Sequence, residues 1–359
     1  MQTSKRTTHA YFAFVITAAL LLPTFAAAQH YQQTNLVSDV PGLAATTDPD
    51  LVNSWGIARS ATSPWWVNDN GTGKSTIYNS SGMKQSFVVT IPPPTGSTET
   101  STPTGIVFSG GVGFAVSNGT ASAPALFIFD TEDGTISGWS PTVDATHAIL
   151  EIDNSGTAVY KGLAIASLDS STLIYAANFK TGKVDVFDSN WQPTTVPGGF
   201  IDASLPEGYA PFGIQNVGGN IFVGFAEQSG GTDEVDGRGL GFVDEFDSGG
   251  HLLMKFQHGP WLNAPWGVAV APANFGHFSK DVLVGNFGSG QIAAFDPTTG
   301  AFMGFLLGAK GPIMIPGLWA IAFGAAAPNN GPTNTLFFAA GIDDEAHGLF
   351  GTLTPIIHP

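Results

Sequence analysis

A unit of about fifty residues recurs six times along this chain and narrows the folds that it can adopt. Each copy opens with a small or aromatic residue and glycine, and a short apolar strand follows. A second strand and then a third strand ending in an aromatic-Asp pair complete most copies. The marker positions are Gly56, Gly105, Gly162, Gly213, Gly267 and Ala320, with spacings of 49, 57, 51, 54 and 53 residues. Such regularity indicates one repeated supersecondary unit.

The unit has the size of a propeller blade. Four strands of five or six residues with their turns need about 40–50 residues. We therefore predict an all-β fold, a six-bladed β-propeller with four-stranded antiparallel blades. The blades are expected roughly over residues 51–95, 102–153, 158–203, 209–258, 263–308 and 315–355. Two β-sandwiches or a β-helix are the alternatives, but a β-helix coil is shorter and the spacing shows no break at mid-chain.

The sixth copy is one strand short. It ends after its third strand, residues 349–353, because Pro355 and the chain end follow. Near the other end of the chain, the extended segment 33–38 has no partner of its own. Since an open ring leaves exposed strand edges, we predict that residues 29–40 supply the outer strand of the sixth blade.

The N-terminal segment has the pattern of a secretory signal peptide. Lys5 and Arg6 precede an apolar stretch over residues 10–22, and three alanines end at Ala28. We predict cleavage after Ala28, so that residues 1–28 are the signal and 29–359 form one secreted or periplasmic domain. A membrane anchor is the alternative, which the shortness of the apolar stretch disfavours. No membrane insertion is expected after cleavage.

The net charge and the composition of the chain limit the partners, the secondary structure and the metal sites that are expected. A formal net charge of −16 repels phosphate backbones and anionic lipid, so nucleic acid is not expected as a partner and cations are. Charged residues make up only 11% of the chain, and its 46 glycines favour strands and turns over amphipathic helices. Cysteine is absent, which excludes disulfides and thiolate metal sites.

A ligand site is expected at one end of the propeller axis. The turns that lead into the innermost strands and those between the second and third strands share one face. The residues before the markers are Trp55, Thr104, Lys161, Phe212, Trp266 and Trp319, and the four aromatic ones are the predicted ligand-binding residues. Flat aromatic surfaces stack on sugars or other planar ligands. The alternative is that these side chains simply pack between blades.

Oxygen-bearing side chains follow the second strands and form a predicted collar. Its members, the candidate metal ligands, are Asp69, Asp130, Asn178, Glu227, Asn286 and Asp343. Several hard oxygen donors are what Ca²⁺ prefers, so Ca²⁺ is the candidate ion. The alternative is that Asp and Asn cap their own turns.

Two turns carry further acidic residues. The turn over residues 227–241 contains Asp233, Glu234, Asp236 and Arg238, and the last turn contains Asp343, Asp344, Glu345 and His347. Long turns on a rigid scaffold often carry binding residues, although a solvated acidic loop is an equal alternative. Glu227 and His347 are the candidates for proton transfer, but a histidine in a turn is also an ordinary surface group.

Familiar catalytic motifs are missing from the sequence. It has no Gly-x-Ser-x-Gly elbow and no His-Glu-x-x-His or His-x-His spacing. Residues 71–75 read Gly-Thr-Gly-Lys-Ser, but Asn68 stands where a phosphate loop has its first glycine. Serine hydrolases, zinc hydrolases and P-loop enzymes therefore lack support.

Several segments carry a resemblance to a known family. They are residues 68–73, 132–139, 262–276, 285–288 and 344–351. Together they resemble a family of exported bacterial β-propellers, some of which carry a C-terminal PEP-CTERM sorting tail. This chain ends without such a tail, so release is expected. The blade pattern is more distantly similar to NHL-type propellers and to calcium-dependent gluconolactonase (regucalcin-type) propellers.

The combined prediction is an exported binding protein that holds a carbohydrate, a small molecule or another protein at the aromatic and acidic mouth. The alternative, which the gluconolactonase resemblance implies, is a metal-dependent lactonase or esterase. There Ca²⁺ would polarise an ester carbonyl while a carboxylate or His347 moves protons. Gluconolactonases draw ligands mainly from the start of the inner strands. Here those positions are largely aromatic, with Asn53 and Asn263 the nearest oxygen donors, so binding is favoured over catalysis.

Overall fold

The computed structural model describes residues 1–2 and 30–356. The predicted signal peptide, beyond its first two residues, lies outside this described part. Strands and turns make up nearly all of the described chain, with two single 3-10 turns, η1 (Asn70–Thr72) and η2 (Gly276–Phe278). Among the described residues, no helix has the length and apolar character needed to cross a membrane.

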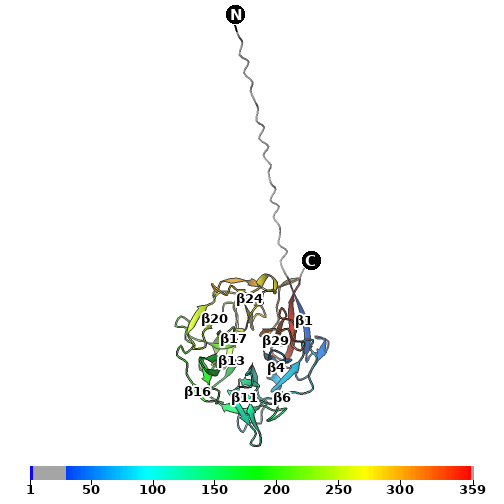
Figure 1. Cartoon of the computed structure of the whole chain (residues 1–359), viewed down its shortest axis with the longest axis vertical. Helices are drawn as coiled ribbons and strands as arrows, with labels where there is room; N and C mark the ends of the chain where they lie inside the picture. Colours follow the sequence, from blue (N-terminus) through cyan, green and yellow to red (C-terminus); the bar gives the residue numbers. More distant parts are fainter. Residues whose placement is uncertain (3–29, 357–359) are drawn as a thin grey trace.

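Six sheets surround one axis, as the sequence predicts (Figure 1). Blade 1 contains β3 (Ser54–Ala58), β4 (Trp65–Asp69), β5 (Lys74–Tyr78) and β6 (Val89–Thr90). Blade 2 contains β7 (Pro103–Phe108), β10 (Phe127–Thr131), β11 (Thr135–Trp139) and β12 (Ile149–Asp153). Blade 3 contains β13 (Tyr160–Leu168), β14 (Ser171–Asn178), β15 (Lys183–Phe187) and β16 (Pro193–Thr194).

The other three blades complete the ring. Blade 4 contains β17 (Tyr209–Val217), β18 (Asn220–Ser229), β20 (Phe242–Phe246) and β21 (Leu252–Lys255), and β19 (Asp233–Val235) pairs with β18. Blade 5 contains β22 (Pro265–Val270), β23 (Val282–Asn286), β24 (Ile292–Phe295) and β25 (Phe302–Phe305). Blade 6 contains β28 (Leu318–Phe323), β29 (Leu336–Ile342), β30 (His347–Pro355) and β1 (Tyr31–Ser38), with β2 (Thr46–Thr47) at its edge. The remaining strands form two small hairpins, β8 (Ala115–Ser117) with β9 (Ser122–Pro124) and β26 (Leu307–Gly308) with β27 (Gly311–Pro312).

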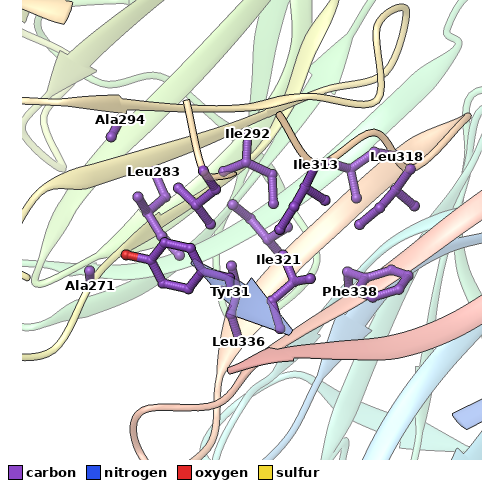
Figure 2. Close-up of a cluster of buried hydrophobic side chains, with 14 of the residues drawn as sticks. Tyr31, Ala271, Leu283, Ile292, Ala294, Ile313, Leu318, Ile321, Leu336 and Phe338 are labelled. Atoms are coloured by element: carbon purple, nitrogen blue, oxygen red, sulfur yellow. The ribbon is translucent and has the colours of Figure 1, made fainter. Parts of the chain in front are cut away.

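The N-terminal strand closes the ring, and this confirms the prediction. β1 runs antiparallel to β30, with Tyr31 opposite Pro355 and Ser38 opposite Leu349. Figure 2 shows the Tyr31 ring among core side chains such as Leu283 of blade 5 and Leu336 of blade 6. The Tyr31 hydroxyl donates a hydrogen bond to the Phe275 carbonyl at 2.9 Å. The closing strand therefore joins two blades through packing as well as one blade through pairing.

The marker glycines allow neighbouring inner strands to approach one another. A Cβ at Gly56 would lie 2.4 Å from the Thr104 carbonyl oxygen, and one at Gly213 would lie 2.0 Å from that of Trp266. Those oxygens belong to the inner strands of the next blades, so any side chain would push the blades apart. The glycine of the repeat is thus a packing requirement of the ring.

Candidate functional site

The beginnings of the inner strands and the ends of the second strands lie at one end of the axis. Tyr160 pairs with Asn178, Pro265 with Asn286, and Ser54 with Asp69. We call this the upper end, and the end where the inner strands finish the lower end. The registers place both kinds of turn at one end of the axis, as predicted; a ligand-binding mouth there stays a prediction.

Five aromatic side chains, which we call the aromatic plug, close the axis at the upper end. Trp55 stacks on Trp319 with 3.4 Å between ring centroids, and Trp266 packs edge-on against both. Phe287 stacks on Trp319 at 4.1 Å, and Phe212 lies tilted against it at 5.6 Å. The four residues predicted to bind a ligand are at most 3% exposed and contact one another. Their binding role stays a prediction.

Lys161, at the start of β13, places its ammonium against the aromatic plug. Its Nζ lies 2.7 Å from Glu132 Oε1 and 3.3 Å from Glu234 Oε2. The same atom lies 5.3 Å from the Trp55 ring centroid and 6.0 Å from that of Phe212. Burial by itself lowers the pKa of Lys161, but the charges of Glu132 and Glu234 outweigh it and raise that pKa. The buried ammonium therefore stays charged at neutral pH.

Three glutamates from alternate blades converge near this ammonium, and we call them the axial glutamate triad. Glu132 comes from the β10–β11 turn, Glu234 from β19 and Glu345 from the β29–β30 turn. Asn70 Nδ2 donates to Glu132 at 2.8 Å, and Asn53 Nδ2 donates to Glu345 at 2.7 Å. Burial, aided by the charges of Glu234 and Glu132, raises the pKa of Glu345. Glu132 and Glu234 thus pair with the Lys161 ammonium, whereas Glu345 is bonded to Asn53 and is influenced by the charges of the other three groups.

A strained turn positions the third member of the triad. Asp343, Asp344 and Glu345 have φ angles of 60°, 52° and 64°, and Asn53 beside them has 49°. The left-handed conformation costs a non-glycine residue about 1–2 kcal/mol. Strain of this kind persists where the surrounding structure imposes it, and it clusters at functional sites.

Three buried polar atoms at the upper end have no partner among the described residues. They are Asn53 Oδ1, Trp55 Nε1 and Trp319 Nε1. A Cβ at Gly341 would lie 2.1 Å from Asn53 Oδ1 and 3.1 Å from Trp319 Nε1, so only glycine fits there. Gly341 and Glu345 both line a cavity of about 450 Å³. Other lining residues are Asp236, Phe287, Ser289 and Asp344. Buried hydrogen-bonding groups are rarely left unpaired, so this end of the axis is unusual in its polar bonding.

Four members of the predicted collar accept main-chain hydrogen bonds within their own blades. The side-chain oxygens of Asp69, Asp130, Asn178 and Asn286 accept hydrogen bonds from the main-chain N–H groups of Thr76, Gly105, Val159 and Asn263, in that order. Glu227 is half-buried, and Asp343 is exposed in the strained turn. Across residues 30–356, no three His, Cys, Asp or Glu side chains are grouped closely enough to hold a metal ion. The Ca²⁺ site stays a prediction.

The two candidates for proton transfer are Glu227, near the end of β18, and His347, at the start of β30. His347 Nδ1 lies 2.6 Å from Asp39 Oδ2, and this hydrogen bond raises the pKa of His347. The charge of Glu227, after burial, contributes to the raised pKa of Tyr209, with which Glu227 pairs across β17 and β18. His347 is therefore hydrogen-bonded to Asp39, and Glu227 lies opposite Tyr209 in the sheet.

Sequence reasoning did not assemble the axial glutamate triad. It treated Glu234 and Glu345 as members of acidic turns, Lys161 as an exception among aromatic positions, and Glu132 only as part of a family-like segment. One signal was present: a single lysine occupies a position that is otherwise aromatic or small. A buried cation needs a charged partner, and in a ring that partner can come from a turn of another blade.

The sequence comparisons find viral relatives. The chain is 33% identical over 328 residues to uncharacterized protein R648 of Acanthamoeba polyphaga mimivirus, which covers 89% of this chain and 78% of that protein. It is also 33% identical to uncharacterized protein L690 of the same virus, over 89% of this chain and 84% of that protein. No protein-family model matches. These relatives are viral, whereas the sequence resemblance indicated a bacterial family.

Solved structures agree on the fold. Virginiamycin B lyase from Staphylococcus aureus superposes with a TM-score of 0.51 at 14% identity, covering 91% of this chain and 100% of the lyase. The soluble aldose sugar dehydrogenase of Escherichia coli gives a TM-score of 0.51 at 10% identity, with the same coverage. At these identities the similarity establishes the propeller architecture alone.

Proposed function

We propose a function from the premise that this chain belongs to the same family as proteins R648 and L690 of Acanthamoeba polyphaga mimivirus. It is a binding propeller without catalytic activity, and it holds a small primary amine at the upper end of its axis. The ligand carries hydroxyl or carbonyl oxygens beside its ammonium group, as an amino sugar does. Export belongs to the proposal, so the ligand is met outside the cytoplasm.

The excess of carboxylates over ammonium groups at the axis is the observation that carries the proposal. Glu132 and Glu234 share the Lys161 ammonium, at 2.7 and 3.3 Å. Glu345 receives an amide hydrogen bond from Asn53 and lines the cavity. Hydrogen bonds between charged groups are roughly twice as strong as neutral ones. A ligand ammonium would supply to Glu345 what Lys161 supplies to the other two glutamates.

The neighbouring polar atoms favour an amine that also carries oxygens. Trp319 Nε1 is a donor without a partner, and Asn53 Oδ1 is an acceptor without one, among the described residues. Both lie beside Gly341, which lines the cavity. Phe287 adds an apolar ring to the same cavity, suited to the C–H face of a sugar.

Calorimetric titration tests the proposal. The mature protein is titrated at pH 6.5 with glucosamine, and with glucose and N-acetylglucosamine as uncharged analogues. We expect binding of glucosamine alone. Glu345→Gln should weaken it at least about tenfold, because a hydrogen bond to a charged group contributes about 1.5–3 kcal/mol. The matched control is Glu99→Gln, which removes an exposed carboxylate elsewhere and should change nothing.

Other outcomes would contradict the proposal. Equal affinity for glucose would mean that charge plays no part, and equal weakening by both glutamine variants would mean that only net charge matters. Absence of heat with glucosamine would refute the proposal outright. The predicted Ca²⁺ collar is tested in the same instrument: EDTA-treated protein should release heat with Ca²⁺, and Asp69→Asn should abolish that heat. A lactone and ester panel on wild type and Glu227→Gln tests the alternative hydrolase.

A further inference from the structure

The lower end of the axis contains a second cavity, separate from the upper one. Its volume is about 480 Å³, and residues from all six inner strands line it. Trp266 lines it too, and the Trp266 ring packs edge-on against Trp55 and Trp319 of the aromatic plug. Trp266 therefore belongs both to the aromatic plug and to the wall of this cavity. The cavity volume is within the usual range of small-molecule sites, about 300–1,000 Å³.

Apolar side chains dominate the wall, and small ones leave it hollow. Ile57, Ile106, Leu163 and Val268 come from four different blades. Alanines stand at further wall positions, namely Ala58, Ala164, Ala269, Ala320 and Ala322. Larger side chains at Ala58 and Ala322, which are only partly buried, would narrow the axis, as side chains fill many small barrels. The wall also contains the polar side chains of Gln215 and Asn216.

One cation, Arg59, lies in this apolar wall. Its Nε and Nη2 donate to the Phe323 carbonyl and its Nη1 donates to the Ser60 carbonyl, so guanidinium N–H groups remain available. The guanidinium carbon lies 5.2 Å from the Trp65 ring centroid. Among the ion pairs of residues 30–356, none involves Arg59, although acidic residues outnumber basic ones 28 to 12 in the chain. A half-buried guanidinium without a carboxylate partner is unusual in so acidic a protein.

We propose that this lower cavity binds a small amphiphile with a carboxylate head, such as a medium-chain fatty acid. The alkyl chain occupies the apolar axis, where each buried methylene contributes about 0.8 kcal/mol of transfer free energy. The carboxylate lies against Arg59, whose planar N–H fork matches a carboxylate. This site is independent of the upper end, because it uses the other side of the aromatic plug and a ligand of opposite charge.

The test uses decanoate, decanol and decyltrimethylammonium as probes of equal chain length. Calorimetry on the mature protein should show binding of decanoate, weaker binding of decanol, and no binding of the cation. Arg59→Met should weaken decanoate binding about 10- to 100-fold and leave decanol unchanged. Arg238→Met is the matched control, since it removes an exposed arginine from a turn at the upper end. It should leave both affinities as they are.

A second pair of variants tests occupancy of the axis itself. Ala322→Trp and, separately, Ala58→Phe should fill the cavity and abolish binding of decanoate and decanol alike, with circular dichroism confirming the fold. Full binding to two folded, filled variants would overturn the proposal. So would absence of decanoate binding to the wild type, or equal losses in Arg59→Met and Arg238→Met. Loss of glucosamine binding has no bearing on this result, so the two proposals fail separately.

Discussion

Replacing Lys161 by methionine removes a charge and keeps most of the packing. The side chain is 3% exposed, and methionine retains the length of the lysine stem. The Lys161 carbonyl, which accepts a 2.7 Å hydrogen bond from Trp266 Nε1, is untouched. What disappears is the cation shared by Glu132 and Glu234, so two carboxylates are left facing the aromatic plug.

The exposure of the two glutamates sets the expected loss of unfolding free energy. Removing one partner of a buried ion pair costs about 3–5 kcal/mol because an uncompensated charge remains. The Glu132 side chain is 26% exposed and can regain water, whereas that of Glu234 is 9% exposed. We therefore expect the lower value, about 3 kcal/mol. A folded unit of this length unfolds with an entropy of roughly 0.7 kcal/mol per kelvin, so the melting temperature should fall by about 4 °C.

The pH dependence separates this mechanism from lost packing. Unpaired carboxylates destabilise the folded state less as acid neutralises them, whereas the cost of lost packing does not depend on pH. The difference between wild type and Lys161→Met should thus shrink from pH 7 to pH 4. Scanning calorimetry at both pH values measures it.

A surface lysine supplies the control. The Lys255 side chain is 49% exposed, with its Nζ 3.7 Å from Asp202, so Lys255→Met should cost under about 1 kcal/mol at either pH. Wild-type melting of Lys161→Met at pH 7 would refute the reasoning. A difference that stays constant down to pH 4 would show that packing, not charge, explains the effect.

Three further expectations concern pH, ring closure and export. Burial raises the pKa values of Asp130 and Asp244 to about 7. Their contribution to stability is therefore complete below about pH 4 and is lost as pH rises through 7. The melting temperature should be higher at pH 5 than at pH 8, and Asp130→Asn should reduce this difference. Val37→Ala in the closing strand should cost roughly 2 kcal/mol in denaturant unfolding, whereas Val112→Ala, at a 69% exposed position, should cost almost nothing; equal costs would mean that closure contributes little. Mass spectrometry of the exported protein should find Gln29 at its N-terminus, and an intact N-terminus would contradict cleavage.

The fold was predictable because the ring imposes local demands on the sequence. Gly56 and Gly213 recur at one place in the unit because adjacent inner strands leave no room for a Cβ. The missing fourth strand of the last copy and the unpaired segment near the N-terminus each indicated the other. The spacing of the repeat and the number of strands were therefore enough to predict the six blades and their closure from the sequence.

The site was only partly predictable, because a repeat pattern does not show which way each side chain points. The pattern located Trp55 and Trp319 at the upper end, but it did not show that they stack across a blade boundary instead of lining an open mouth. Asp130 accepts a hydrogen bond from the Gly105 N–H on the inner strand of its own blade, a contact that neither the metal-ligand prediction nor the turn-capping alternative specified. Glu132 and Glu234 lie 102 positions apart in the chain, and only the ring curvature brings both to Lys161.

Trp266 is the residue common to the two ends of the axis. Its ring belongs to the aromatic plug and also lines the lower cavity, while its Nε1 donates to the Lys161 carbonyl. Any effect of a lower ligand on the axial glutamate triad must pass through this indole or through the inner strands. Coupling between sites requires an element with two discrete arrangements, yet the indole is 3% exposed and fixed by its hydrogen bond. The two ends should therefore bind their ligands independently, an amine at the upper end and an amphiphile with a carboxylate head at the lower end.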